Sequence, residues 1–320
     1  MVRISFIIPL YNCLPLTQAM LTSLRATLPA DLAHEILFVD DGSTDGTRAW
    51  LATLPDPPFR VLLNERNLGY AVGNNRAAAV ARGEFLALLN NDLILQPGWL
   101  EPMLAAHTAL GGSAGLIGNV QRDTRTGLID HAGLEIDLTG KPTHIRALPP
   151  LFSRWRHPIR SVPAVTGACL LVERALWQRL GGFDEAFHNG GEDIDLCFRA
   201  RAVGRVNAVA LRSVIRHHVS SSPGRKARDE ENSYRLARKW RDEFFAAADF
   251  GLRAWCRDYL AATFREVHSE DYRTVLAVAA YVARLRAEPP AVALAGVKAG
   301  MAREFARWES LYPNAVTASR

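Results

Sequence analysis

Short apolar runs alternate with amphipathic segments through the first ninety or so residues. Four of these runs are candidate strands, at residues 4–9, 35–40, 59–63 and 85–89. Three segments between them have helical character, at residues 14–28, 44–54 and 71–81. Because the apolar runs are continuous rather than alternating, they predict an α/β fold with a parallel sheet covered by helices on both faces. The ligand of such a sheet binds at the carboxyl ends of its strands.

The rest of the chain divides into a weakly patterned middle and a helical end. Residues 111–172 carry several Gly and Pro residues, which predicts short strands and loops. Residues 175–180 and 194–203 look helical. From Asp229 to Trp308 the chain is almost wholly helix-forming, with interruptions at Gly251 and at Pro289-Pro290. We therefore expect a helical C-terminal appendage, whose mixed faces favour packing against protein over lying in a membrane interface.

Composition indicates a globular protein with an uneven charge. The chain has 320 residues, of which 48% are hydrophobic and 22% charged, and its formal net charge is +5. Two basic stretches contain no Asp or Glu, at residues 138–172 and 203–228. Such stretches are commonly solvated faces, but a diphosphate or an anionic lipid would also fit them, and a nucleic-acid partner is not expected.

Cysteine spacing and hydropathy bear on the compartment. The four cysteines form no C-x-x-C pair, which argues against a zinc site or a disulfide framework and favours core residues in a reducing compartment. The first apolar run is broken by Pro9, so it fits a strand better than a signal peptide. No apolar run approaches the roughly 18 residues that span a bilayer. We expect a cytoplasmic protein, at most peripheral on the inner face of the membrane.

Acidic and amide side chains follow two of the candidate strands. The second run ends in Asp40-Asp41-Gly42, with Ser43 or Thr44 as a helix N-cap. Two adjacent carboxylates repel each other and one cap suffices, so hydrogen bonds to a ligand are favoured over capping alone. The fourth run ends in Asn90-Asn91-Asp92, whose oxygens suit Mg²⁺ or Mn²⁺ shared with phosphates. The alternative is an ordinary Asn/Asp turn.

Three further segments carry candidate chemistry. Asn67-Leu-Gly69 opens a Gly- and Asn-rich turn through Asn75 that could approach a nucleotide closely. Glu192 and Asp193 crowd the start of a helix, where either could act as a general base or cap the helix. Asp195 and Arg199 are spaced for an ion pair along that helix. His217-His218 could bind a metal or phosphate, although a histidine pair is more often structural.

Taken in order, these segments resemble the inverting family 2 glycosyltransferases, in the rhamnosyltransferase-like branch. The resemblance rests on the following residues: Ile7-Ile8-Pro9-Leu10-Tyr11-Asn12, Val39 to Asp45, Asn67 to Asn75, Leu88 to Asp92, Gly181 to Glu185, Glu192 to Leu196, and His217-His218. It implies a GT-A fold, a mostly parallel sheet flanked by helices. It places a catalytic domain at 1–228, with a nucleotide-binding half at 1–110 and an acceptor half at 111–228, and a helical extension at 229–320.

The resemblance also implies what the residues do. It makes Asp193 the base, with Glu192 as runner-up, and Asp92 a ligand of Mg²⁺ or Mn²⁺, with His217 preferred over His218 as the matching histidine. The residues implied to bind the nucleotide sugar are Pro9, Tyr11, Asp40, Asp41, Asn67, Gly69, Asn75 and Asn90. Many relatives carry Asp at position 90. Asn90 matches the Asn-x-Asp form of rhamnosyltransferase-like members, which makes dTDP-rhamnose a candidate donor.

The implied activity is transfer of a sugar from a UDP-, dTDP- or GDP-linked donor to an acceptor hydroxyl with inversion, in the synthesis of bacterial surface polysaccharide or glycoconjugate. The acceptor would be a saccharide or lipid-linked. Peripheral membrane contact and a homo-oligomer remain open. Two rival interpretations are a glycoside hydrolase with Asp92 and Asp193 as its carboxylate pair, and a non-catalytic nucleotide-sugar-binding module.

Overall fold

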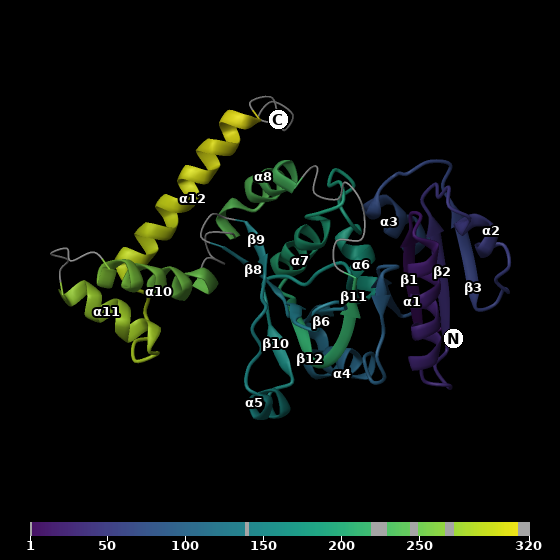
Figure 1. Ribbon diagram of the computed structural model, residues 1–320, viewed down its shortest axis with the longest axis horizontal. Coiled ribbons are helices and arrows are strands. Elements are labelled where there is room, and N and C mark those ends of the chain that lie inside the picture. The colour runs from purple at the N-terminus through teal and green to yellow at the C-terminus, as the bar shows by residue number, and fades with distance from the viewer. Residues whose placement is uncertain (1, 138–140, 219–228, 244–248, 266–271, 313–320) are drawn as a thin grey trace. The chain divides into compact units, whose positions relative to one another are not determined.

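The computed structural model describes residues 2–137, 141–218, 229–243, 249–265 and 272–312. The chain forms two compact units (Figure 1). The first, called here the sheet unit, comprises Met1–Leu134 and His144–Asn232. The second, called the helical unit, comprises Glu135–Thr143 and Ser233–Arg320.

The four predicted strands are present, and they are mutually parallel neighbours in one large sheet. They are β1 (Ile4–Leu10), β2 (His34–Asp40), β3 (Phe59–Leu63) and β4 (Phe85–Leu89). β1 lies between β2 and β4, and β3 pairs with the outer side of β2. Because the strands run the same way, Leu10, Asp40 and Leu63 end at one edge in register. The carboxyl ends of the strands detected in the sequence therefore lie at one edge, as expected.

The remaining strands add antiparallel members to a sheet that is mostly parallel, as expected. The order is β10-β12-β6-β11-β4-β1-β2-β3, with β5 beside β12 and β7 beside β6. β11 is antiparallel to both β4 and β6, whereas β6 and β12 are parallel to each other. The bounds are β5 Leu93–Ile94, β6 Ala114–Asp123, β7 Ile129–His131, β10 Ile159–Ser161, β11 Cys169–Glu173 and β12 Val206–His217, and the separate pair is β8 Leu134–Ile136 with β9 Pro142–His144.

The two longest strands, β6 and β12, were not expected from the sequence. β6 carries Asn119 and Gln121, and β12 carries Asn207 and Ser213, all of which are buried polar residues that interrupt an apolar run. The pairing of the two strands also shifts register between Ala210 and Val214. A strand with buried polar residues and a bulge does not show a regular apolar pattern, so only the sheet itself reveals it.

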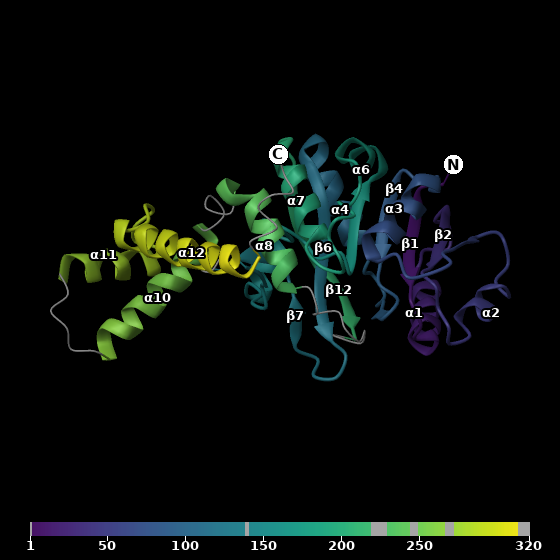
Figure 2. The ribbon, with the colours of Figure 1, turned by 90° about the horizontal axis from the view of Figure 1, so that it is seen from above.

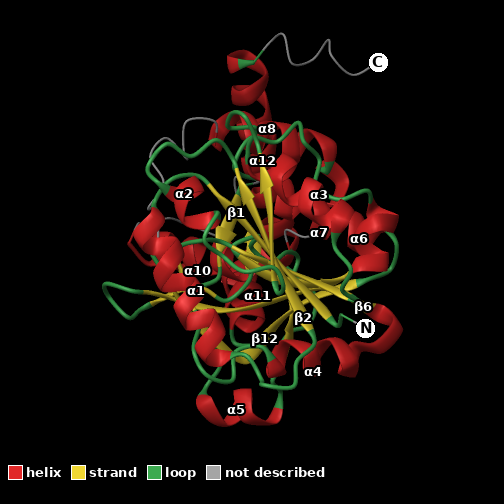
Figure 3. Ribbon diagram, turned by 90° about the vertical axis from the view of Figure 1, so that its right-hand side faces the viewer, coloured by secondary structure: helices red, strands yellow, loops and turns green. Residues whose placement is uncertain are grey.

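Helices cover both faces of this sheet (Figures 2 and 3). One face of β1, with Phe6 and Ile8, shares a core with Met20 of α1 and with Trp99 and Met103 beside or in α4. On the opposite face lie α3, α6 and α7. The helices of the sheet unit are α1 Leu14–Thr27, α2 Thr47–Leu51, α3 Tyr70–Val80, α4 Glu101–Leu110, α5 Leu151–Arg156, α6 Arg174–Leu180 and α7 Glu192–Ala202.

The expected helix at residues 44–54 is shorter than predicted. α2 begins after Gly46, which has a φ of 90°, and no side chain caps it. The predicted N-cap at Ser43 or Thr44 is therefore wrong. Both residues instead contact Asn12 at the end of β1: the Asn12 amide donates to Ser43 Oγ at 2.7 Å, and the Thr44 amide donates to Asn12 Oδ1 at 2.8 Å. Tertiary contacts use the groups that would otherwise have capped the helix.

Three of the described helices lie in the helical unit, and the first of them packs against the other two. They are α10 (Asp249–Arg265), α11 (Tyr272–Val282) and α12 (Ala291–Leu311), and α8 (Asp229–Lys239) spans the boundary with the sheet unit. The expected break at Gly251 is wrong because α10 continues through it, whereas the break at Pro289-Pro290 is confirmed. The buried residues of α12, spaced as one helical face, are Ala293, Val297, Met301, Phe305 and Trp308. Among the described residues, no helix is long and apolar enough to cross a bilayer.

Candidate active site

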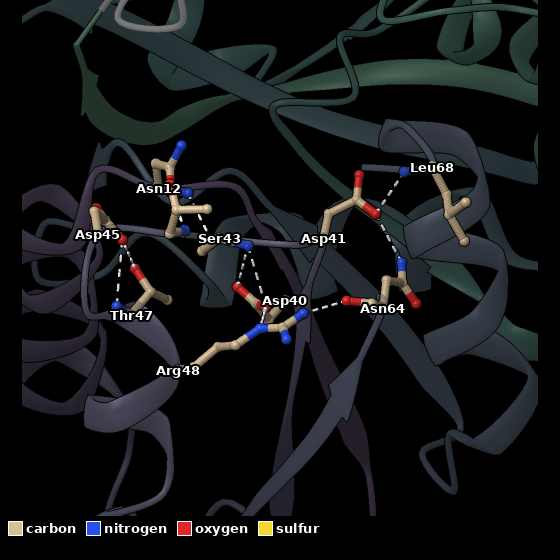
Figure 4. A network of polar contacts seen from close by, with 10 residues as sticks. Asn12, Asp40, Asp41, Ser43, Asp45, Thr47, Arg48, Asn64 and Leu68 are labelled. Atoms are coloured by element: carbon tan, nitrogen blue, oxygen red, sulfur yellow. Dashed lines mark hydrogen bonds and ion pairs between the residues drawn. The ribbon is translucent and has the colours of Figure 1, made fainter. Parts of the chain in front are cut away.

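Asp40, at the end of β2, is a fully buried carboxylate with protein partners (Figure 4). It accepts a hydrogen bond from Arg48 Nε of α2 at 2.7 Å, and the Ser43 amide lies 3.3 Å from both of its oxygens. The same guanidinium donates to the backbone oxygen of Asn64. Asp40 therefore joins the ends of β2, α2 and β3, and its charge is compensated by Arg48.

Asp41 organises the turn that precedes α3. Its Oδ1 accepts from Asn64 Nδ2 at 2.7 Å and from the Leu68 amide at 2.8 Å (Figure 4). Its Oδ2 accepts from the Gly69 amide at 2.8 Å. The side chain is 6% exposed. Two successive backbone amides at the start of a helix form a natural anion site, and here the anion is a side chain of the protein. Both aspartates therefore have a structural role in the fold, which the sequence ranked below hydrogen bonds to a ligand.

Gly42 allows this turn to lie directly against the end of β2. Its φ is +83°, and a Cβ atom there would lie 2.8 Å from the backbone carbon of Arg66. That separation is too short for a real Cβ contact, so a larger residue would push the turn at residues 64–69 away from the end of β2. The Asp-Asp-Gly sequence thus acts as one unit that positions the turn.

The end of β1 is tied to the same edge. Asn12 and Cys13 both have left-handed backbone conformations, with φ of 57° and 60°. The Asn12 amide contacts Ser43, and the Asn12 side chain contacts Thr44. Tyr11 is 52% exposed at this edge, and Pro9 lies half-buried under α3, where a Cβ on Gly73 would be 3.7 Å from its ring. Asn67 is exposed on the adjoining turn.

The tip of β4 is joined to the C-terminal end of β12. His217 Nε2 lies 3.3 Å from Asp92 Oδ1, and the His218 amide donates to the Asp92 backbone oxygen at 3.0 Å. His217 is 4% exposed, and neither ring nitrogen has a hydrogen bond within the described structure. His218 turns the other way, with Nδ1 3.0 Å from Thr124 Oγ1. The pairing brings together Asp92 and the histidine that sequence weakly preferred.

Asn90, on the same tip, links this corner to the start of α7. Its amide donates to the Ala168 backbone oxygen at 2.9 Å, just before β11. Its side-chain oxygen is buried and makes no hydrogen bond among the residues described. The neighbouring Gly167 amide donates to Asp193 Oδ2 at 2.7 Å. The backbone from Gly167 to Ala168 therefore connects the β4 tip with the first turn of α7.

Asp193 is held in a defined orientation. Besides the bond from Gly167, its Oδ1 accepts from the Ile194 amide at 2.8 Å. Tyr70 at the start of α3 donates its hydroxyl to the Gly167 backbone oxygen at 2.7 Å, and a Cβ on Gly167 would touch both Tyr70 and Asp193. Glycine at position 167 thus allows the first turns of α3 and α7 to approach each other.

The other predicted residues near α7 form hydrogen bonds or ion pairs within the protein. Glu192 is buried and accepts from the Gly190 amide at 2.7 Å. Asn75 exchanges hydrogen bonds with the Phe183 backbone and also donates to Glu185. The expected ion pair is confirmed, with Arg199 Nε 2.8 Å from the fully buried Asp195. Of Glu192 and Asp193, the latter is the less buried.

Two histidines that the sequence did not single out also belong to this region. His131, at the end of β7, is fully buried, and its ring contacts that of His144 edge-on at 4.9 Å between centroids. Burial holds the pKa of His131 well below its usual value, and His144 and His217 lower it further. Burial also lowers the pKa of His144, although Asp130 and Asp193 oppose the shift. Both histidines lie in or beside the segment at 111–172 that lacked a readable pattern.

The side chains of Asp92 and His217 have the chemistry to bind a divalent ion together with a diphosphate. Asp92 and His217 offer one hard oxygen and one imidazole nitrogen at a common corner, and a hard cation shared with phosphates takes its remaining ligands from phosphate oxygens and water. Among the described residues, no group of three or more His, Cys, Asp or Glu side chains could hold a metal ion by itself. The residues present therefore fit an ion brought in together with a diphosphate.

Comparison with known proteins gives one family and several relatives. Residues 5–181 match the protein-family model described as glycosyl transferase family 2. An O-antigen biosynthesis protein, RfbC, of Myxococcus xanthus is 33% identical over 250 residues, covering 74% of this chain and 19% of the relative. The N-acetylglucosaminyl-diphospho-decaprenol L-rhamnosyltransferase of Mycobacterium tuberculosis is 29% identical over 221 residues, covering 62% of this chain and 71% of the relative.

An uncharacterized protein of Sinorhizobium fredii is 32% identical over 260 residues, and the match covers 74% of this chain and 28% of that protein. The chain thus corresponds to less than a third of this relative and of the Myxococcus protein.

The fold is shared with many solved structures, and two of them show the extent of the likeness. GalNAc-T7 with UDP, GalNAc and Mn²⁺ matches 76% of this chain and 49% of its own, with a TM-score of 0.61 and 19% identity. The mannosyltransferase PcManGT of Pyrobaculum calidifontis, with GDP-Man and Mn²⁺, matches 98% of this chain and 88% of its own, with a TM-score of 0.56 and 20% identity. At such identities the likeness concerns the fold, and it confirms the expected architecture of a sheet flanked by helices with a helical C-terminal region.

Proposed function

The chain belongs to glycosyl transferase family 2, and we propose that it transfers a sugar from a nucleotide-sugar donor to an acceptor hydroxyl with inversion at the anomeric carbon. The family match confirms the resemblance found in the sequence, and with it the expectation of a glycosyltransferase. The observation that carries the detailed proposal is that three groups lie together at one sheet edge: the Asp92–His217 pair, the Gly167 backbone and Asp193.

In this proposal the nucleoside and the diphosphate of the donor bind at two neighbouring places along the sheet edge. The nucleoside lies beside the ends of β1 and β2, where Asp41 fixes the turn at residues 64–69 and Tyr11 is exposed. The diphosphate lies toward Asp92. The residues proposed for the nucleotide sugar remain Pro9, Tyr11, Asp40, Asp41, Asn67, Gly69, Asn75 and Asn90. Because Asp40, Asp41 and Asn75 already have protein partners, we propose that they act largely by positioning backbone groups around the donor.

Asp92 and His217 would hold Mg²⁺ or Mn²⁺ together with the donor. When bound there, the ion would act as a Lewis acid on the diphosphate leaving group. Two properties of the residues support this: the buried imidazole has no hydrogen bond in the described structure, and its Nε2 lies 3.3 Å from the Asp92 carboxylate. The two structural neighbours were solved with Mn²⁺, which agrees with the choice of a divalent ion.

We propose Asp193 as the general base and Glu192 as the runner-up. The backbone amides of Gly167 and Ile194 orient the Asp193 carboxylate at the start of α7, and a carboxylate held in this way is suited to accept the proton of an acceptor hydroxyl. Glu192 is more buried and is already bonded to the Gly190 amide. Geometry therefore favours Asp193, which stands closer to solvent at the start of α7.

The donor and the biological setting follow from relatives. The mycobacterial relative is named for rhamnosyl transfer and the Myxococcus relative for O-antigen biosynthesis. Together with Asn90, these names support a dTDP-linked deoxyhexose as the first donor to test and surface polysaccharide or glycoconjugate as the product class. UDP- and GDP-linked sugars remain the alternatives, and a saccharide or lipid-linked acceptor on the cytoplasmic side is proposed for each.

A panel of dTDP-, UDP- and GDP-sugars with Mg²⁺ or Mn²⁺ tests the proposal, read by thermal shift and by release of the nucleoside diphosphate. We expect nucleotide sugars with one particular nucleobase to stabilise the protein. The sugar of that donor should be transferred to an acceptor, or slowly hydrolysed when no acceptor is present. Asp193→Asn should lower turnover by about 10²- to 10⁴-fold while nucleotide affinity stays near that of the wild type. Glu192→Gln is the matched control, because it neutralises the neighbouring carboxylate.

Each rival interpretation has a distinct result in the same panel. Cleavage of a glycoside without any nucleotide would identify a hydrolase. Binding of a nucleotide sugar with neither transfer nor hydrolysis would identify a binding module. If Asp193→Asn retains full turnover and Glu192→Gln does not, the base is Glu192. A protein that responds to no nucleotide sugar would overturn the proposal as a whole.

A further inference from the structure

The short helix α5 displays three large apolar side chains to solvent. Leu151, Phe152 and Trp155 are 75%, 67% and 68% exposed, and they lie within one helical turn of each other. In Figure 1, α5 lies at the margin of the sheet unit beyond β10. Single exposed apolar residues are common on proteins, but two aromatic rings and a leucine on six residues form a patch that calls for a covering partner.

Arginines surround this patch. Arg156 stacks over the Phe152 ring, with its guanidinium carbon 5.8 Å from the ring centre. Arg212, on the neighbouring β12, lies 5.9 Å over the Trp155 ring and also donates to the Trp155 backbone oxygen. No ion pair joins Arg156 or Arg212 to a carboxylate within the described part of the chain. Their charges are therefore available to an anionic partner.

The surrounding sequence has no acidic residue to oppose this charge. From residue 138 to residue 172 there is no Asp or Glu, and α5 lies in the middle of that stretch. Aromatic rings flanked by arginines, without nearby carboxylates, are the composition of segments that lie in the headgroup region of a bilayer. Rings of Trp and Phe reach the boundary of the acyl chains, while the guanidinium groups remain among the phosphates.

Size distinguishes a lipid surface from a protein partner. A stable interface between proteins covers about 800 Å² on each side and about 20–30 residues. Three apolar side chains on a six-residue helix fall far short of that. A bilayer requires much less, because a few inserted side chains and several favourable charges suffice for reversible binding.

We propose that α5, with Leu151, Phe152 and Trp155 inserted and Arg156 and Arg212 beside them, docks the protein on an anionic lipid surface. This inference does not depend on the proposed transfer reaction. It gives the protein a reversible contact with the membrane through the sheet unit, at a place other than the ends of β1, β2 and β4. The membrane is recognised here by its negative headgroups together with its apolar interior.

Flotation of the full chain with defined vesicles tests this contact. We expect binding to phosphatidylcholine vesicles that contain phosphatidylglycerol, weaker binding to phosphatidylcholine alone, and release by high salt. The triple change Leu151→Ser, Phe152→Ser and Trp155→Ser should lower the partition coefficient by at least about tenfold. Because these side chains are largely exposed, the melting temperature should not change.

Two matched controls distinguish binding through α5 from nonspecific binding to vesicles. Leu63→Ser with Leu128→Ser removes exposed leucines, 54% and 70% accessible, elsewhere on the sheet unit and should leave binding unchanged. Arg156→Glu should weaken binding by at least about fivefold. Arg179→Glu, at an exposed position of α6 and with the same change in net charge, should have much less effect.

Three results would overturn the proposal. Wild-type protein that stays with the soluble fraction on anionic vesicles excludes a lipid partner. Binding that the triple serine variant retains would locate the contact elsewhere. A wild-type dimer in light scattering that the same variant disperses, without vesicle binding, would identify a second copy of the chain as the occupant. In each case the donor panel described above is unaffected, so the two proposals fail separately.

Discussion

Asp41→Asn is the change that most directly tests how the nucleotide edge is built. The native carboxylate accepts three hydrogen bonds, from Asn64 and Leu68 on one oxygen and from Gly69 on the other. An asparagine keeps one carbonyl oxygen. If that oxygen faces Asn64 and Leu68, the amide nitrogen faces the Gly69 N–H, and two donors meet in a site that is only 6% exposed.

The expected loss follows from these contacts. A hydrogen bond to a charged group contributes about 1.5–3 kcal/mol, and a buried donor without an acceptor costs about 1–3 kcal/mol. Asp41→Asn removes at least one such bond and leaves the Gly69 N–H without an acceptor, while the bonds kept on the other oxygen lose their charge. We expect the free energy of unfolding to fall by about 2–4 kcal/mol. The turn at residues 64–69 should also lose its fixed position, which weakens nucleotide binding.

Urea unfolding followed by circular dichroism measures the first effect, and titration with the nucleotide found in the donor panel measures the second. Asp31→Asn is the matched control, since it makes the same chemical change at an exposed carboxylate. If Asp41→Asn unfolds within about 0.5 kcal/mol of the wild type but no longer binds nucleotide, Asp41 contacts the ligand and does not hold the turn. If both properties are unchanged, the network in Figure 4 contributes neither stability nor binding.

Three further changes test other parts of the sheet unit by urea unfolding. Gly42→Ala should lower the free energy of unfolding more than Gly98→Ala does. Both glycines have positive φ, which costs alanine about 1–2 kcal/mol, but of the two only Gly42 has other backbone atoms within 4 Å. Equal losses would show that this close approach does not contribute to stability. Asp195→Asn should cost about 1.5–3 kcal/mol, because the hydrogen bond from Arg199 loses its buried charged acceptor. An unchanged midpoint would contradict this. His131 has a folded-state pKa far below its unfolded value near 6.5, so protons bind the unfolded chain preferentially. The free energy of unfolding should therefore decrease as the pH is lowered below about 6.5, by up to about 1.4 kcal/mol per pH unit. His131→Phe should flatten that slope, and an equally steep slope in the variant would show that other groups cause it.

Sequence determined the parts of this protein that depend on local pattern. The first four strands are continuous apolar runs, so their existence, their parallel pairing and the edge at which they end could all be predicted. The residues just beyond the strands follow directly in the chain, so Asp40, Asp41, Asn90 and Asp92 could be placed at one edge. The spacing of Asp195 and Arg199 likewise fixed their ion pair, because residues four apart meet on one side of a helix.

Only the tertiary structure decided the partners of these side chains. Arg48 compensates Asp40, the turn before Gly69 engages Asp41, and His217 reaches Asp92 across more than a hundred residues. Such contacts depend on how strands are ordered in the sheet, which local periodicity does not contain. β6 and β12 were missed because buried polar residues break their apolar runs, and those same strands bring His131 and His217 to the site. The sequence thus set which groups stand at the edge, and long-range packing set which of them meet.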